Sequence, residues 1–349
     1  MIPASQLKSA AHYIAVLRPL LPAEAFEPEP RHVIRIFAHL AVILCGYVVL
    51  RGTDQWWVAV LAALIIGHSQ ACLVFLAHGL THNAILKNGR PKRALELVAW
   101  GLNVIPPTLW LRVHNQTHHV ETNTLRDTDR TYRPSESTVA TWLYTRLFFP
   151  NRQTPLHHPF VLFHFITYIL RHLVAVLLPG ATKPSIVTFK PNYTPELRRQ
   201  IIVEVALIVA FQIALWYFLG GNWWRYVLAV PVPLLVASSV AMTYIFTNHF
   251  LNPLCERVDP LVVCTSVSVP RVFDWLHDYM SFHTEHHLFP GVNPRFYPLV
   301  STLLLEHFPE RYNRLTMAEA WRRLWLHDEF IGEPTSLPAA GGNIAVAAE

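Results

Sequence analysis

Three histidine clusters are the part of this sequence that could do chemistry. Their members are His78 and His82, then His114, His118 and His119, and last His283, His286 and His287. On a helix, residues three or four positions apart lie on one face, so the imidazoles of such a pair can reach one metal ion or two adjacent ions. Neighbouring histidines point about 100° apart on a helix, so His118 and His119 can supply two ions from a single turn.

A fourth element brings the number of candidate ligands to nine. His249 follows Asn248 where the last long apolar segment ends. Imidazole suits zinc, copper, iron and nickel, and a single zinc ion takes three or four ligands. Nine histidines are too many for one ion and suit two ions with open positions. The residues alone therefore favour a dinuclear redox iron site.

Six polar residues near the clusters are candidates to support the ligands. A carboxylate that accepts the second ring N–H of a ligating imidazole fixes its tautomer, and an amide can hold a metal ion through water. These residues are Asn248, Asp127, Asp129, Asp274, Asp278 and Glu285.

The remaining histidines are interpreted as ordinary hydrogen-bonded residues. Among them, His172 and His277 are the first candidates for an exception, because they neighbour the clusters or the expected cap. The full set is His12, His32, His39, His68, His157, His158, His164, His172, His277, His307 and His327.

The composition is that of a polytopic membrane protein. Of 349 residues, 52% are hydrophobic and 15% charged, whereas soluble domains carry about a quarter charged residues. Four segments have the length and polarity of transmembrane helices. They are residues 33–50, 56–77, 201–219 and 226–246, the last expected to kink at Pro231 and Pro233.

The distribution of charge and the number of membrane crossings between the clusters give the topology. Residues 78–200 hold about fifteen Lys and Arg, whereas the two Trp-rich joints between paired spans hold about two, so every cluster is expected on the cytoplasmic face. Residues 95–111 and 159–179 are also apolar. If only one of these stretches crossed the membrane, it would put the second or third cluster on the opposite side of ~30 Å of hydrocarbon from the first cluster. Both stretches are therefore predicted to be interfacial or re-entrant.

These observations predict an all-α membrane protein with four transmembrane helices, interfacial helices and a cytoplasmic helical cap that holds the metal site. Residues 1–32 are expected to be a cytoplasmic or interfacial segment, with residues 5–20 amphipathic on the membrane surface. Residues 33–333 are expected to form one membrane domain and residues 334–349 a disordered tail. No cleaved signal peptide is expected.

Other features restrict the compartment and the partners. The four cysteines indicate neither a disulfide framework nor a thiolate metal site. The net charge of +5 is modest, and no basic stripe interleaved with aromatics indicates nucleic-acid binding. Arg greatly outnumbers Lys, which favours a GC-rich bacterial source and hence a plasma membrane.

The order of the clusters resembles the membrane fatty acid desaturase superfamily over roughly residues 33–300. Residues 283–290 (HTEHHLFP) look like its third histidine box, residues 114–123 (HNQTHHVETN) resemble the second, and residues 247–249 (TNH) are similar to a short fourth element. The resemblance implies a mushroom-like helical fold, two irons in a cytoplasmic cap, and O₂-dependent oxidation of a lipid chain.

Three departures argue against a front-end desaturase. Gly79 stands where many members have Asp, His283 stands where front-end enzymes carry Gln, and no fused haem domain is seen at either end. Electrons are therefore expected from a separate protein, by analogy a ferredoxin or a small cytochrome. A basic surface could dock such an acidic carrier. Its residues would be Lys92, Arg126, Arg130 and Arg133.

The predicted function is insertion of a double bond into an acyl chain, since the HxEHHxFP ending favours desaturation. A hydroxylase or ketolase of the same superfamily, acting on a carotenoid, sterol or sphingoid lipid, stays open because the same boxes support both outcomes. A metal transporter is a remote alternative, whose ligands should lie near mid-bilayer on broken helices. Trp100, Trp110 and Trp275 are predicted walls of a lipid tunnel.

Overall fold

The computed structural model describes residues 2–129, 164–178 and 192–326. Among these residues the fold is helical apart from one short parallel sheet, in which β1 (Ser266–Ser268) pairs with β2 (Arg314–Thr316). The prediction of an all-α membrane protein is confirmed. The tail predicted at residues 334–349 lies outside the described residues.

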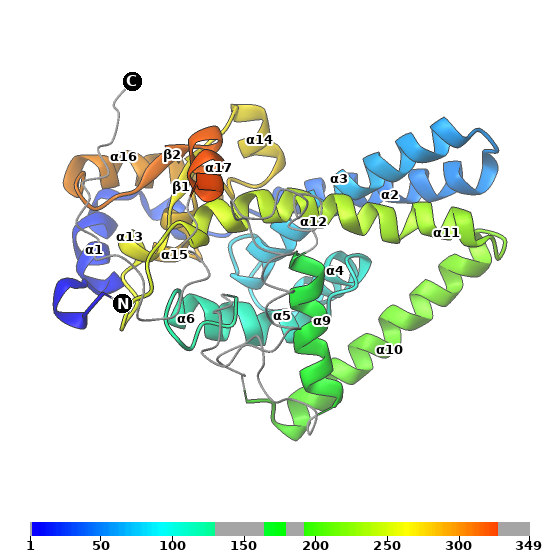
Figure 1. The fold of residues 1–349 in the computed structure, drawn as a ribbon, viewed down its shortest axis with the longest axis horizontal. Helices are drawn as coiled ribbons and strands as arrows, with labels where there is room; N and C mark the ends of the chain where they lie inside the picture. Colours follow the sequence, from blue (N-terminus) through cyan, green and yellow to red (C-terminus); the bar gives the residue numbers. More distant parts are fainter. Residues whose placement is uncertain (1, 130–163, 179–191, 327–349) are drawn as a thin grey trace.

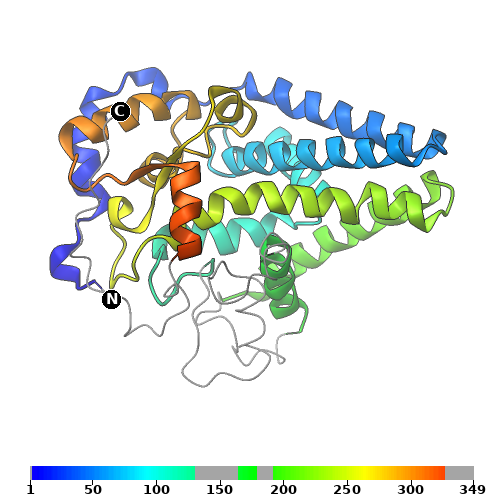
Figure 2. The ribbon, with the colours of Figure 1, turned by 45° about the horizontal axis from the view of Figure 1, so that its top comes forward.

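Four helical segments are long and apolar enough to cross a membrane, as predicted. They are α2 (His32–Gly52), α3 (Trp56–Thr81), α10 (Pro195–Phe218), and the pair α11 (Trp223–Ala229) and α12 (Pro231–Ile245). Figures 1 and 2 show α2, α3 and α12 extending side by side away from the elements near both chain ends. The fourth span is interrupted at Val230, immediately before Pro231, where a helical backbone is disfavoured.

Helix α3 is the central span. Within its most apolar stretch 61% of residues are buried, against 22% for α2 and for α10. Its 26 residues rise roughly 39 Å, more than the ~30 Å of a hydrocarbon core. The C-terminal end of α3 therefore projects beyond the lipid and carries His78 into the region of the clusters.

The stretch predicted as interfacial or re-entrant at residues 95–111 folds as a bent hairpin. Helix α4 (Arg90–Leu102) is followed by α5 (Pro107–Trp110), the π-helical segment η4 (Leu111–His118) and α6 (His119–Glu121), with a bend of 96° between the two arms. Pro106 and Pro107 stand at the bend, where they prevent one continuous helix.

The hairpin begins and ends at the same end of α3. Near its start, Lys92 donates from Nζ to Asn83 Oδ1 at 2.8 Å. At its tip, Gln70 Nε2 donates to the Leu102 carbonyl at 2.9 Å, roughly 16 Å along α3 from its C-terminus at 1.5 Å per residue. The return arm brings His114 Nε2 to 2.9 Å from His78 Nε2. This path is re-entrant, in agreement with the argument from the number of membrane crossings.

A buried carboxylate anchors the hairpin to α10. Glu204 accepts hydrogen bonds from the Thr108 amide at 2.9 Å and the Thr108 hydroxyl at 2.5 Å, and it pairs with Arg93. A charged group in a transmembrane helix is costly unless it is paired in this way. Of the second predicted interfacial stretch, α9 (His164–Leu177) is described and is too short to span.

The remaining elements form a layer around the end of α3. The short helices before the first span are η1 (Ala4–Gln6), α1 (Ala10–Leu17), η2 (Arg18–Leu20) and η3 (Ala23–Phe26). Those after the last span are η6 (Phe246–Phe250), α13 (Pro260–Val263), α14 (Arg271–Leu276), α15 (His283–Leu288), η7 (Pro294–Phe296), α16 (Tyr297–His307) and α17 (Met317–Leu326).

The segment expected to be amphipathic at residues 5–20 packs against protein on one side. Helix α1 contacts α15 and α16, and its Tyr13 and Leu17 are fully buried in that contact. The Tyr13 hydroxyl donates to Asp259 at 2.9 Å and accepts from Arg311 at 2.9 Å. Protein therefore covers part of the apolar face, whereas Val16 and Leu20 are exposed, and the membrane-surface location stays a prediction.

Candidate metal centre

The structure brings all nine predicted histidine ligands together in two adjoining groups. The first histidine group offers one nitrogen from each of five residues, all within 4.8 Å of one another: His78, His82, His114, His119 and His286. The second histidine group has His118, His249 and His287 within the same limit. His283 completes it, with Nε2 at 2.7 Å from His249 Nε2 and 3.1 Å from His287 Nε2.

Neighbouring histidines are divided between the groups. His118 belongs to the second group and His119 to the first, and His286 and His287 are divided likewise. The rings of His119 and His287 stack with their centroids 4.2 Å apart, so the two groups touch. One helical turn thus supplies both groups, which is the arrangement expected for two adjacent ions.

Two π-helical segments carry three of these histidines. Segment η4 bears His114 and His118, and η6, which extends α12, bears His249. A π-helix closes i→i+5 hydrogen bonds and is frequent at functional sites. The sequence argument assumed α-helical spacing throughout, because nothing in the residue pattern distinguishes the wider turn.

Two of the predicted carboxylates lie against ligands. The His118 Nδ1 is 2.8 Å from Asp127 Oδ1, and the His114 Nδ1 is 3.1 Å from Asp129 Oδ2. A ring N–H that donates to a carboxylate leaves the opposite nitrogen, Nε2, with its lone pair directed into the group. Asp129 also accepts a hydrogen bond from Tyr168.

The other predicted supporting residues contact different partners. Asp274 accepts from Ser281, Asp278 pairs with His32 and Arg35, and Glu285 accepts from Ser266 and Tyr312. None of these contacts is with a histidine of the two groups.

Asn248 is fully buried beside His249. Its Nδ2 lies 3.5 Å from the Met280 carbonyl, and its Oδ1 has no hydrogen-bond partner among the described residues.

Three supporting residues were missed by the sequence argument. Tyr297 places its hydroxyl 3.1 Å from His286 Nδ1, and Asn115 Nδ2 lies 3.0 Å from His82 Nδ1. Thr122 lies 3.3 Å from His287 Nδ1 and donates its one proton to the His118 carbonyl, so it accepts from the imidazole. Asn115 and Thr122 stand within the second cluster and could have been considered, whereas Tyr297 carries no sequence signal.

Burial keeps most of these imidazoles neutral. Burial first, and neighbouring imidazoles second, hold the pKa of His283, His286 and His287 well below the ordinary value. Burial also lowers the pKa of His118, but Asp129 and Asp127 outweigh it and raise that pKa to about 9. A metal ion binds imidazole in its neutral form, through the free lone pair, so the lowered pKa values favour metal binding by these rings.

The donor set fits metal ions. Nε2 atoms of paired histidines face one another at 2.7 to 3.2 Å. The Nδ1 atoms of His114 and His118 face carboxylates, and a neutral ring that donates from Nδ1 has only a lone pair at Nε2. A cation in each group would accept these lone pairs. Nine imidazoles without a thiolate suit iron more than structural zinc.

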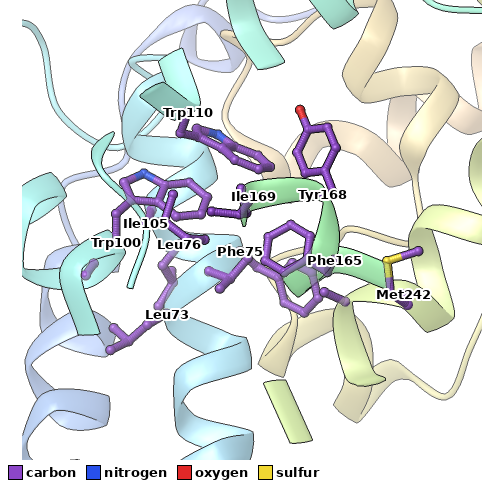
Figure 3. Close-up of a cluster of buried hydrophobic side chains, with 14 of the residues drawn as sticks. Leu73, Phe75, Leu76, Trp100, Ile105, Trp110, Phe165, Tyr168, Ile169 and Met242 are labelled. Carbon is purple, nitrogen blue, oxygen red and sulfur yellow. The ribbon is translucent and has the colours of Figure 1, made fainter. Parts of the chain in front are cut away.

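A narrow apolar cavity of about 50 Å³ borders both groups. His78 and His114 line it from the first group, and His249 and His283 line it from the second. Its remaining wall is apolar or aromatic, as Figure 3 shows for several of its residues. These are Val74, Phe75, Trp110, Phe165, Tyr168, Ala241, Met242, Ile245 and Met280, with Asp129 at one side.

A second apolar cavity continues toward the middle of α12. It holds about 160 Å³ between Ile105, Ile169 and Leu234, and Phe165 lines it together with the first cavity. Of the three tryptophans predicted as tunnel walls, Trp110 lines the first cavity. Trp100 packs behind it at 4.4 Å, and Trp275 is 56% exposed on α14.

Two described residues of the predicted docking surface are already paired. Lys92 is buried against Asn83 and Asn88 and lies 3.3 Å from Glu96, so it is not available to a carrier. Arg126 pairs with Glu121 at 3.4 Å. Arg130 and Arg133 lie outside the described residues.

Fold and site together define a membrane-embedded protein with a buried, histidine-only candidate metal centre against an apolar cavity. The sequence model of the fatty acid desaturase family matches residues 54–319, and the chain belongs to this family. A search among curated proteins finds no significant match.

Proposed function

We propose that this protein is an O₂-dependent lipid desaturase that inserts a double bond into a fatty acyl chain. Two iron ions would be held by the nine histidines of the two groups. The observation that carries this proposal is the convergence of these imidazoles on one narrow apolar cavity. Iron and O₂ would supply the removal of hydrogen from unactivated methylenes.

The residues of the chain would bind and orient the substrate. Phe75, Phe165 and Met242 would confine an acyl chain within reach of both groups and exclude water. Asp127 and Asp129 would hold the Nδ1 protons of His118 and His114, which fixes those rings for metal binding. Asn248 remains a candidate ligand through water, on the ground of its unpartnered Oδ1.

The apolar lining of the cavity supports a lipid chain as substrate. Val74, Phe75 and Met242 offer contacts to methylenes, which acyl, sphingoid and carotenoid lipids all present in some form, and the HxEHHxFP ending favours the acyl chain among them. Hydroxylation by the same centre is the second candidate. A transporter would need ligands at mid-bilayer on broken helices, whereas here the ligands gather at the end of α3.

The same geometry supports the proposed location. Both histidine groups adjoin the end of α3, and the excess of Lys and Arg in residues 78–200 supports a cytoplasmic location for that end, while the preponderance of Arg over Lys supports a bacterial plasma membrane. A separate ferredoxin or small cytochrome would deliver electrons there.

Lipid profiling of an expression host tests the proposal. Wild-type protein is expected to produce acyl chains about 2 Da lighter, whereas hydroxylation would make them about 16 Da heavier. The His118→Ala variant should produce neither. His307→Ala, which alters an exposed histidine on α16, is the matched control and should behave as wild type. Unsaturation that persists in His118→Ala would refute the site assignment.

A further inference from the structure

A third cluster of metal-type side chains lies apart from the two histidine groups. One ligand atom each from His68, Cys72 and His277 lies within 4.8 Å of the others. His68 and Cys72 are one turn apart on α3, and His277 follows α14, 205 residues further along the chain than Cys72. The sequence argument assigned no metal to His68 and no thiolate site to any cysteine.

The three side chains lie within reach of a single ion. His277 Nε2 lies 3.3 Å from His68 Nε2, whereas Cys72 Sγ lies 3.9 Å from the other ring nitrogen of His68, Nδ1. One ion can bind only one nitrogen of His68, so an ion between the two imidazoles would bind both Nε2 atoms, and the Cys72 side chain would have to turn toward it. One ligand atom of each residue already lies within 4.8 Å of the others, against roughly 3.3 to 3.8 Å in a tetrahedral zinc site with Zn–N of 2.0–2.1 Å and Zn–S of 2.3 Å.

The surroundings hold the His277 ring in place. Tyr244 puts its hydroxyl 2.8 Å from His277 Nδ1, and Phe75 and Phe273 pack on the ring at 5.3 and 5.6 Å between centroids. If Nδ1 donates to the Tyr244 oxygen, Nε2 presents its lone pair to the cluster. Burial, followed by His68 and Arg35, lowers the pKa of His277 to about 4, so its ring is neutral.

Accessibility differs among the three ligands. Cys72 and His277 are buried, whereas His68, within the span α3, is partly exposed. The nearest fixed cation, Arg35, is paired with Asp278 at 2.8 Å. A thiolate from Cys72 would offset half of the charge of a divalent ion. Imidazole and thiolate together select zinc-type ions rather than the hard cations that prefer oxygen.

We propose that His68, Cys72 and His277 bind one zinc ion as its three protein ligands, separate from the histidine groups. The ion would join α3 to the segment after α14. This proposal does not depend on desaturation, because its ligands and its readout are distinct from those of the dinuclear centre.

Cobalt spectroscopy distinguishes this site from the rest of the protein. The two histidine groups contain no sulfur, so a thiolate-to-Co²⁺ charge-transfer band can come only from a cysteine. Iron-loaded, full-length protein in detergent is titrated with Co²⁺. The band should saturate at one Co²⁺ per chain in wild type and in Cys45→Ser, which removes the exposed free cysteine of α2.

The band should be lost in Cys72→Ser, and total zinc after growth with zinc should fall by about one per chain while iron stays unchanged. His68→Gln, which alters the partly exposed ligand, repeats the test if Cys72→Ser does not fold, and should weaken Co²⁺ binding at least about 10-fold. A band that survives Cys72→Ser, or no band in folded wild type, would leave only a hydrogen-bonded histidine pair and overturn the proposal.

Discussion

The two histidine groups differ in how far their side chains are exposed at the surface of the molecule. In the first, His82 and His119 are partly exposed, whereas every ligand of the second is buried. Their supports differ as well. The second group rests on the fully buried Asp127 through His118, whereas the carboxylate that supports the first group through His114, Asp129, is partly exposed.

This difference indicates that two ions bound here would not be equivalent. An ion in the second group would be held by rings from η4, η6 and α15 and shielded on all sides. An ion in the first group would lie nearer the partly exposed rings. The first group is thus the side through which ions can exchange, and the second is the more firmly constrained side.

Removing neighbouring ligands is the strongest test of this comparison. His118→Ala takes a ligand from the second group and His119→Ala takes one from the first. Each should lower desaturation at least about 100-fold and remove about one iron per chain. Metal analysis and product assays measure both. His118→Ala should also lower the melting temperature more, because it leaves buried Asp127 without its imidazole. Equal melting temperatures would contradict the asymmetry.

Asp127→Asn should have the next largest effect. An amide oxygen is neutral and accepts a weaker hydrogen bond from the His118 Nδ1–H than a carboxylate does, so iron affinity should fall about 10- to 100-fold. Competition with a chelator measures the affinity. Asp54→Asn, in the exposed joint between α2 and α3, is the control and should leave it unchanged. A wild-type affinity in Asp127→Asn would show that the carboxylate does not orient the ligand.

Tyr297→Phe should act more weakly on the first group. It removes one neutral hydrogen bond to His286, worth about 0.5–1.5 kcal/mol, so iron affinity should fall roughly 2- to 10-fold. The same competition assay applies. An effect as large as that of Asp127→Asn would show that the Tyr297 hydroxyl supports its ligand as strongly as the Asp127 carboxylate does.

The smallest effect should appear only in the rates at which a chelator removes iron. A chelator added to the iron-loaded protein should remove iron in two phases, with about one iron per chain lost in each. The faster phase should belong to the first group, because His82 and His119 are partly exposed. His119→Ala should abolish the fast phase and leave the slow one. Single-phase release from wild type would remove the basis for the comparison.

Much of this architecture could be predicted from local pattern. Length and apolarity mark α2, α3, α10 and the α11–α12 pair, because a helix must be long and apolar to cross hydrocarbon. The number of membrane crossings predicted an interfacial or re-entrant path for residues 95–111, and the bent hairpin fits the re-entrant alternative. Local pattern did not predict which side of α1 protein covers, since an amphipathic face can pack on protein as well as on lipid.

The polar partners were harder to predict. Asp127 and Asp129 follow the second cluster closely and were identified, but Asp278 and Glu285, equally near in sequence, face other groups. Proximity along the chain does not fix the direction of a side chain. Thr122 and Tyr297 act through hydroxyls that no motif marks.

The sequence by itself determined the identity of the nine imidazoles, their helical spacing and the number of spans, since these follow from residue type and local period. Only the tertiary structure decided how the imidazoles divide into two groups and which residues hydrogen-bond to their Nδ1 atoms. It also decided that Cys72 lies near His277. Those contacts join residues far apart in the chain. Packing of α3, the hairpin and α15 against one another sets them, and no local pattern encodes that packing.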